Sequence, residues 1–269
     1  MINLGGLKLN NIILPASGTM AYTEAYEPYL DFSCLGALVT KAVTLKPRAG
    51  NPPPRLVEVE NGIINSVGLQ NKGLDYFLAS ELPELIQYGP PVIVNVAGAT
   101  EEEYGQVVKQ LDQAKGVAAI ELNISCPNVK EGCQAFGSDP VIARRVVAMV
   151  REKTSLPLIV KLTPNVEDIT VIAKAVVAAG ADVLSLINTV KAEAKGLSGG
   201  LSGPVIKETA LKMVRQVRAV SDIPLIGIGG VASSEDVRQF LDAGAQAVQV
   251  GTAALLNPAI LEQLARCIY

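Results

Sequence analysis

The residues best suited to acid–base chemistry lie in one short stretch, ELNISCPNVKEGC, which spans residues 121–133. It begins like the end of a buried strand and then places a thiol, Cys126, between two amides, Asn123 and Asn128. The chain has no histidine, so a proton transfer has to use Cys, Lys, Asp, Glu or Tyr. Cys126 is therefore a candidate base. The alternative interpretation is that it is a small buried apolar side chain.

Lysines and asparagines interrupt several other apolar runs. Lys41 and Lys161 stand where an ammonium group is costly unless it meets an anion or another partner. Asn95, Asn123 and Asn188 stand at comparable positions. Each of them alone could cap a strand end or satisfy a loop carbonyl. Together they indicate a bound polar, partly anionic ligand.

Glycines mark a second kind of site. Two of the apolar runs end at glycines, in Gly229-Gly230 and Gly251-Thr252, and a glycine-rich turn, GGLSGP, occupies 199–204. Glycine allows the backbone to approach an anion closely. Each could be an ordinary strand-to-helix turn. Because the pattern occurs at two consecutive strand ends, it favours a phosphate site.

Eight short apolar runs must position these residues. Nearly continuous apolar runs are typical of parallel strands covered on both faces, and amphipathic segments separate several of them. The predicted strands are 12–18, 37–42, 91–98, 118–125, 157–164, 181–189, 224–230 and 247–253, and the predicted helical segments include 101–116, 139–154, 166–180, 204–220 and 233–244. This order predicts one domain, residues 1–269, folded as a (β/α)8 TIM barrel whose floor is closed by a short N-terminal β-hairpin. The alternative is an open doubly wound sheet. In a barrel, the polar residues would gather at the carboxyl ends of the strands, where barrel active sites lie.

Composition excludes several classes of function. The net charge of −3 gives no electrostatic case for nucleic acid. No apolar run reaches the roughly 18 residues of a membrane span, and no basic-then-apolar leader opens the sequence, so we expect a cytoplasmic protein. The spacing of the four cysteines matches no metal or iron–sulfur pattern, so we expect free thiols and no metal.

Nine motifs in order carry a resemblance that spans nearly the whole chain. They are TLKPRAGNPPPR (44–55), INSVGLQN (64–71), NVAG (95–98), ELNISCPNVK (121–130), KLTPN (161–165), LSLINT (184–189), GGLSGP (199–204), IGIGG (226–230) and QVGTA (249–253). In these motifs the chain resembles the catalytic subunits of class 1B dihydroorotate dehydrogenases. The resemblance implies an FMN-containing (β/α)8 barrel that oxidises (S)-dihydroorotate to orotate in pyrimidine (UMP) biosynthesis.

The resemblance also implies which residues form the site. The hydride from substrate C6 would go to FMN and the proton from C5 to Cys126, with Lys41 as a second catalytic residue. FMN would contact Ala16, Ser17, Gly18, Lys41, Ala42, Asn95, Asn123, Lys161, Ile187, Thr189, Gly203, Gly229, Gly230, Gly251 and Thr252. Substrate would contact Lys41, Asn65, Val67, Gly68, Leu69, Asn123, Asn128, Asn188 and Thr189. Asparagines suit this ring because each offers both a donor and an acceptor.

Class 1B enzymes pass electrons to NAD⁺ through a second subunit that carries FAD and a 2Fe–2S cluster, so the resemblance implies that partner and a homodimer within a heterotetramer. A class 1A enzyme that uses fumarate directly remains an alternative. Outside the family, the alternatives are a flavin-free barrel lyase with Lys41 or Lys161 as a Schiff base, and a non-catalytic barrel that binds a metabolite or a partner chain.

One segment departs from the family pattern. Between INT and GGLSGP only VKAEAKGLS (190–198) is present, about ten residues shorter than the family resemblance leads us to expect. The segment is either trimmed in this protein or incomplete in the sequence, and the difference affects the expected cover over the substrate. The proline-rich run 47–55 we interpret as structural.

Overall fold

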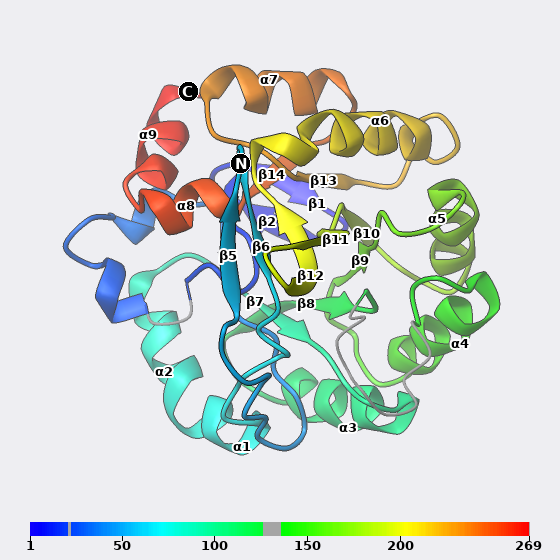
Figure 1. Cartoon of the computed structure of the whole chain (residues 1–269). Coiled ribbons are helices and arrows are strands. Elements are labelled where there is room, and N and C mark those ends of the chain that lie inside the picture. The colour runs from blue at the N-terminus through cyan, green and yellow to red at the C-terminus, as the bar shows by residue number, and fades with distance from the viewer. Residues whose placement is uncertain (21–22, 126–135, 269) are drawn as a thin grey trace.

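A ring of eight parallel strands forms the centre of the molecule in the computed structural model, which describes residues 1–20, 23–125 and 136–268 (Figure 1). The strands are β3 (Ile13–Pro15), β4 (Leu38–Val39), β7 (Val92–Val96), β8 (Val117–Asn123), β9 (Leu158–Leu162), β10 (Val183–Leu186), β13 (Leu225–Ile228) and β14 (Ala247–Val250). They pair in the order β3-β14-β13-β10-β9-β8-β7-β4, so each predicted run contributes one strand. The nearly closed ring confirms the predicted TIM barrel and excludes the open doubly wound sheet.

The seam of the barrel lies between β3 and β4. One backbone hydrogen bond crosses it, from the Gly36 N–H to the Ile13 carbonyl oxygen at 2.9 Å. The two chains approach so closely that a Cβ on Gly36 would lie 1.9 Å from the Asn11 carbonyl oxygen. Only a residue without a side chain fits at that point.

Helices surround the ring (Figure 1). They include α3 (Glu101–Asp112), α4 (Pro140–Arg151), α5 (Ile169–Ala178), α6 (Lys207–Arg218), α7 (Ser234–Asp242), α8 (Thr252–Leu256) and α9 (Ile260–Cys267). Asp139 caps α4 by accepting from the Val141 and Ile142 N–H groups. The stretch between β6 and β7 is helical but irregular, and consists of α1 (Leu74–Tyr76), η3 (Phe77–Glu81), α2 (Leu82–Leu85) and η4 (Ile86–Tyr88). Short 3-10 turns complete the connections at η1 (Thr23–Tyr26), η2 (Phe32–Cys34) and η5 (Pro204–Ile206).

The N-terminal hairpin, β1 (Ile2–Leu4) and β2 (Leu7–Leu9), lies at the amino ends of the barrel strands. Its turn packs against the start of β10, because a Cβ on Gly5 would lie 2.7 Å from the Asp182 carbonyl oxygen. The hairpin therefore closes the floor, as predicted.

A second sheet covers the other end. It has the order β11-β12-β6-β5 and is antiparallel, with strands β5 (Leu56–Val59), β6 (Gly62–Asn65), β11 (Val190–Ala194) and β12 (Leu197–Ser202). Figure 1 shows this cover sheet in front of the ring of strands. None of these four strands is among those predicted from the sequence. The short segment 190–198 belongs to a tight hairpin whose two-residue turn, Lys195-Gly196, has positive φ angles of 50° and 76°.

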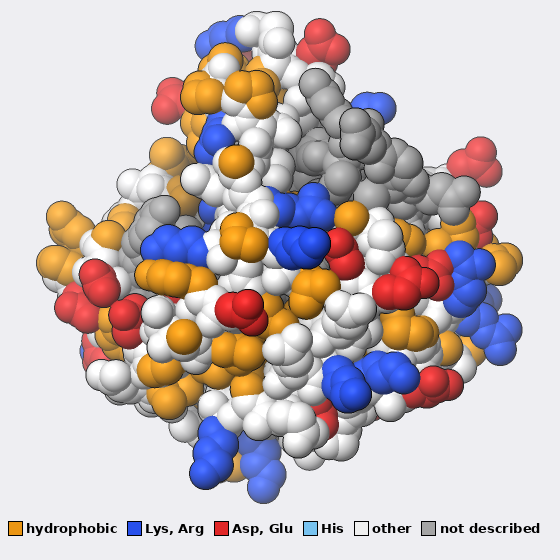
Figure 2. Space-filling model, turned by 90° about the horizontal axis from the view of Figure 1, so that it is seen from below, with side chains coloured by type: hydrophobic (Ala, Val, Ile, Leu, Met, Phe, Trp, Pro, Cys, Tyr) orange, Lys and Arg blue, Asp and Glu red, His pale blue; other side chains and the backbone are white. Residues whose placement is uncertain are grey.

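On the face seen in Figure 2, the Lys and Arg side chains of the described residues lie among Asp, Glu and apolar ones. None of the helices in the described part of the chain is long and apolar enough to cross a membrane.

Candidate functional site

The carboxyl ends of the strands bring most of the predicted residues to one mouth. After β3, the Ala16 N–H donates to the Val250 carbonyl oxygen at 2.8 Å, which joins this loop to the end of β14. Ala16 is buried, Ser17 is half-buried and Gly18 is exposed. A polar ligand could therefore reach the backbone of this turn without displacing a side chain.

Lys41 follows β4 and is half-buried. Burial lowers the pKa of its ammonium group, the charge of Arg55 lowers it further, and the charge of Glu81 opposes both effects. Arg55 is held in place by hydrogen bonds to the carbonyl oxygens of Asn51 and Ala49 and to Gln70 Oε1. Lys41 is thus a cation in a partly desolvated site, suited to pairing with an anionic ligand.

A pocket of about 700 Å³ opens beside Lys41. Ala42, Arg48, Gln70 and Glu81 also line it, so charged and amide groups surround the space.

The barrel axis holds a carboxylate that is not among the site residues predicted from the sequence. Glu121 on β8 is fully buried. Its Oε2 accepts from Asn95 Nδ2 at 2.6 Å, and its Oε1 accepts from Ser185 Oγ at 2.9 Å and Gln249 Nε2 at 2.8 Å. Lys161 Nζ lies 3.8 Å from Oε2. We call these five residues the axial polar cluster. A signal for it was present in the sequence, because Glu121 stands two residues before Asn123 and so shares its face of the strand.

Asn123 and Asn188 lie together above this cluster. Asn188 Nδ2 donates to Asn123 Oδ1 at 3.4 Å, and the Thr189 N–H donates to Asn188 Oδ1 at 2.8 Å. The backbone of Asn123 is fixed from behind by the Tyr104 hydroxyl, which donates to its carbonyl oxygen at 2.7 Å. These amides have rigid positions on strand ends, as a recognition site requires.

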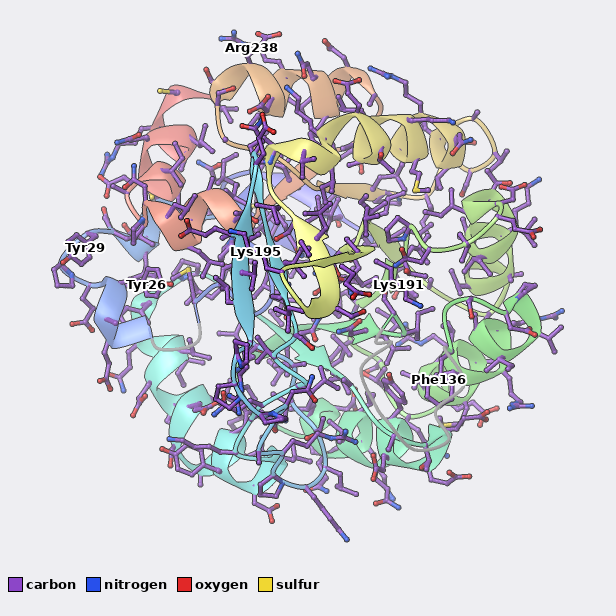
Figure 3. The ribbon with its side chains drawn as sticks, in the orientation of Figure 1. Tyr26, Tyr29, Phe136, Lys191, Lys195 and Arg238 are labelled. Atoms are coloured by element: carbon purple, nitrogen blue, oxygen red, sulfur yellow. The ribbon has the colours of Figure 1, made fainter. Side chains whose placement is uncertain are left out.

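The cover sheet brings Asn65 to the same place. Asn65 Nδ2 donates to the Gly200 carbonyl oxygen at 3.1 Å, while a Cβ on Gly200 would lie 2.1 Å from Thr189 Oγ1. Gly200 on β12 therefore lies against two of the predicted substrate residues, Asn65 on β6 and Thr189 just before β11. Figure 3 shows Lys191 and Lys195 on the hairpin in front of the barrel, and Lys195 Nζ donates to the Glu58 carbonyl oxygen at 3.0 Å.

The loop after β6 carries Val67, Gly68 and Leu69. The Val67 carbonyl oxygen accepts from the Asn51 N–H at 3.0 Å, and Gly68 packs directly on Asn51. Leu69 has a φ of 57°, a left-handed conformation that a leucine rarely adopts. Such strain occurs most often where a site dictates the backbone.

The glycine-rich strand ends meet on another side of the mouth. A Cβ on Gly230 would lie 3.1 Å from the Gly203 carbonyl oxygen and 2.7 Å from Lys207 Cβ, and a Cβ on Gly203 would lie 3.5 Å from Thr252 Cγ2. Gly203, Gly229 and Gly230 all have positive φ, which favours glycine. Ile187 is buried nearby and donates its N–H to the Ile228 carbonyl oxygen at 3.0 Å, and Gly251 is the N-cap residue of α8.

Comparison with known proteins agrees with this geometry. The sequence profile of the dihydroorotate dehydrogenase family matches residues 1–268. The chain belongs to the dihydroorotate dehydrogenase family.

Several relatives within the dihydroorotate dehydrogenase family share about half of their residues with this chain. Proteins from Citrifermentans bemidjiense and Listeria innocua are each 50% identical to it, and each comparison covers 98% of this chain and 90% of the relative. A protein from Desulforudis audaxviator is 51% identical, over 96% of this chain and 87% of the relative. All three are named dihydroorotate dehydrogenase B (NAD(+)), catalytic subunit.

Two residues that the family resemblance singles out, Cys126 and Asn128, lie outside the described residues, as does Cys133. The cysteines that the structure describes are Cys34 and Cys267, and both are free thiols. Burial, followed by the charges of Glu262 and Asp31, raises the pKa of Cys34 to about 11, so it remains a thiol near neutral pH. Among the described residues no group of three or more Cys, Asp or Glu could hold a metal ion.

Proposed function

We propose that this chain oxidises (S)-dihydroorotate to orotate, as the catalytic subunit of an NAD⁺-linked dihydroorotate dehydrogenase. The observation that carries the proposal is 50% identity over 98% of the chain to proteins named as that subunit. The polar mouth of the barrel provides independent support, because its amides and its lysine match the groups that dihydroorotate presents.

Substrate recognition would rest on the four asparagines and Lys41. Dihydroorotate has a carboxylate, two carbonyl oxygens and two N–H groups, so it needs donors and acceptors on the same edge. Asn65, Asn123 and Asn188 supply both kinds of group from strand ends and the cover sheet. Lys41 would pair with the carboxylate. Asn128 would complete the set.

FMN fits the remaining residues of the mouth. Asn95 Oδ1 is buried without a hydrogen-bond partner among the described residues, so it can accept from a ligand N–H group. The cradle of Gly203 and Gly230 has no room for a Cβ, and glycine there would allow the backbone to approach a phosphate closely. Lys161 places a nearly buried ammonium group at the same mouth. When bound there, FMN would supply the acceptor for the hydride that leaves substrate C6.

The proton at substrate C5 would go to Cys126. A thiol has an ordinary pKa near 8.5, so part of it is thiolate at mildly alkaline pH and can act as a base. Asn123, on the strand that leads into this segment, would hold the ring while the proton transfers to sulfur.

A partner would receive the electrons. The relatives are named as catalytic subunits that use NAD⁺, which supports a second subunit. From the family resemblance we infer that this subunit carries FAD and a 2Fe–2S cluster, and that a homodimer of this chain joins two copies of it. Fumarate as a direct acceptor is the alternative.

Purified protein tests the proposal in two steps. The protein should carry one FMN, seen as a yellow colour, and should reduce NAD⁺ with dihydroorotate only when the partner subunit is added. A colourless protein that cannot take up FMN would contradict the proposal. Efficient turnover with fumarate alone would instead show the class 1A reaction.

The base assignment has its own test. Cys126→Ala should lower the rate of flavin reduction by dihydroorotate by about 10²-fold or more, because proton abstraction loses its base. Cys126→Ser should retain more of that rate than Cys126→Ala, and its rate should rise towards high pH, because a hydroxyl is a weaker acid than a thiol. Cys34→Ala is the control and should have the wild-type rate. Full activity of Cys126→Ala would exclude the thiol as the base.

A further inference from the structure

The axial polar cluster contains a charge that the proposed reaction does not use. Glu121 is fully buried at the barrel axis, and four strands other than its own direct side chains at it: Asn95 from β7, Lys161 from β9, Ser185 from β10 and Gln249 from β14. Burying a carboxylate in a barrel core is costly unless it is paired and hydrogen-bonded. Its presence therefore calls for a physical reason.

The contacts favour an ionised carboxylate. Two of its hydrogen bonds come from amide nitrogens, which can only donate, and the third comes from the Ser185 hydroxyl. The ammonium group of Lys161 lies 3.8 Å away, close enough for a strong Coulomb interaction but beyond direct hydrogen-bond distance. At this distance Glu121 does not occupy the Lys161 N–H groups, so a ligand can accept from them. The negative charge of Glu121 partly cancels the positive charge of Lys161.

The carboxylate also fixes two amides. Asn95 and Gln249 both direct their NH₂ groups at Glu121, because a flipped amide would place an oxygen against the anion. Their oxygens, Asn95 Oδ1 and Gln249 Oε1, are buried and have no partner among the described residues. A single anion therefore determines the orientation of the polar groups around the mouth.

We propose that Glu121 is a positioning residue that sets the reduction potential of the bound flavin. The proposal rests on the proposed function, since it requires FMN at this mouth. Lys161 stabilises negative charge on a reduced flavin, and the fixed anion behind it weakens that effect. Glu121 thereby holds the potential low enough for the flavin to pass electrons on.

The test is the midpoint potential of FMN in wild-type protein and in Glu121→Gln, measured by dye equilibration under anaerobic conditions. The variant keeps the size of the side chain and loses the charge. We expect the ratio of the dissociation constants for reduced and oxidised FMN to fall at least tenfold, which equals a rise of about 30 mV for a two-electron couple. Glu193→Gln removes an exposed carboxylate on β11 and should leave the potential unchanged.

A potential in Glu121→Gln that is unchanged or lower than that of wild type overturns the proposal. A decrease would mean that Glu121 only holds Lys161 in place, so that its loss releases the lysine from the flavin. These measurements need no turnover. If wild-type protein binds FMN but does not oxidise dihydroorotate, the proposed function fails while the role of Glu121 is still decided. If it binds no FMN, both fail.

A second variant covers the case in which Glu121→Gln does not fold. Removing one partner of a buried ion pair is usually more damaging than removing both. The double variant Glu121→Gln/Lys161→Met removes both charges of the pair and is therefore the fallback. Its potential should lie close to that of wild type, because the opposing fields of Glu121 and Lys161 are lost together. A potential well below that of wild type would show that only the lysine acts on the flavin and would overturn the proposal.

Discussion

At the scale of single residues, Lys41 has the property that can be tested most directly. Its pKa lies below its ordinary value of 10.5 because of burial and the charge of Arg55. An anionic ligand binds the protonated form. Affinity for a carboxylate should therefore be greatest below the folded pKa of Lys41 and should fall as the pH rises through it, before pH 10.5 is reached.

Orotate binding measures this dependence. At neutral pH, Lys41→Gln should bind orotate at least about tenfold more weakly than wild type, because it loses a charge-assisted hydrogen bond. The orotate affinities of wild type and Lys41→Gln should converge as the pH rises. Taking the ratio of the two affinities cancels the effect of any titration of orotate itself. Glu81→Gln should move the convergence to lower pH, since the Glu81 charge raises the pKa of Lys41. A ratio independent of pH up to 10.5 would contradict this role.

Single residues also show what the sequence could reveal. Lys161 and Asn95 stood out because a polar side chain inside an apolar run is conspicuous, and both lie in the axial polar cluster. Glu121 stands in the same kind of run, yet a single glutamate on a strand by itself predicts a side chain that faces solvent. Its partners come from strands up to 128 positions away, and only the closed barrel brings them together.

At the scale of elements, the barrel strands were predictable and the cover sheet was not. Barrel strands are buried on both faces, so their residues are apolar throughout. The strands β11 and β12 are half exposed and rich in glycine and charged residues, and β12 is held by pairing with β6, more than 130 residues earlier in the chain. Such strands have weak local signals, because distant pairing rather than propensity forms them.

The cover sheet should control substrate affinity through Gly200. In Gly200→Ala the new methyl group would collide with Thr189 Oγ1, so β12 has to move away from Thr189 and Asn65. We expect the KM for dihydroorotate to rise about tenfold, while the thermal midpoint changes little, because misplaced binding groups weaken the site more than the fold. Ser198→Ala, at an exposed position of the same strand, is the matched control. An unchanged KM in Gly200→Ala would show that the hairpin does not shape the site.

At the scale of the whole molecule, stability depends on closing the ring at the seam between β3 and β4. There the Gly36 N–H bonds to Ile13, and a Cβ would lie 1.9 Å from the backbone of Asn11. Gly36→Ala should therefore open the seam and lower the thermal midpoint by about 6 °C or more, the equivalent of roughly 3 kcal/mol. Gly105→Ala on α3 is the comparison, because its methyl group would meet only the flexible end of Met149 and alanine favours a helix by about 1 kcal/mol. If both variants melted near the wild-type temperature, the barrel would tolerate an open seam, and the mouth would have to be held in place by the cover sheet and the helices alone.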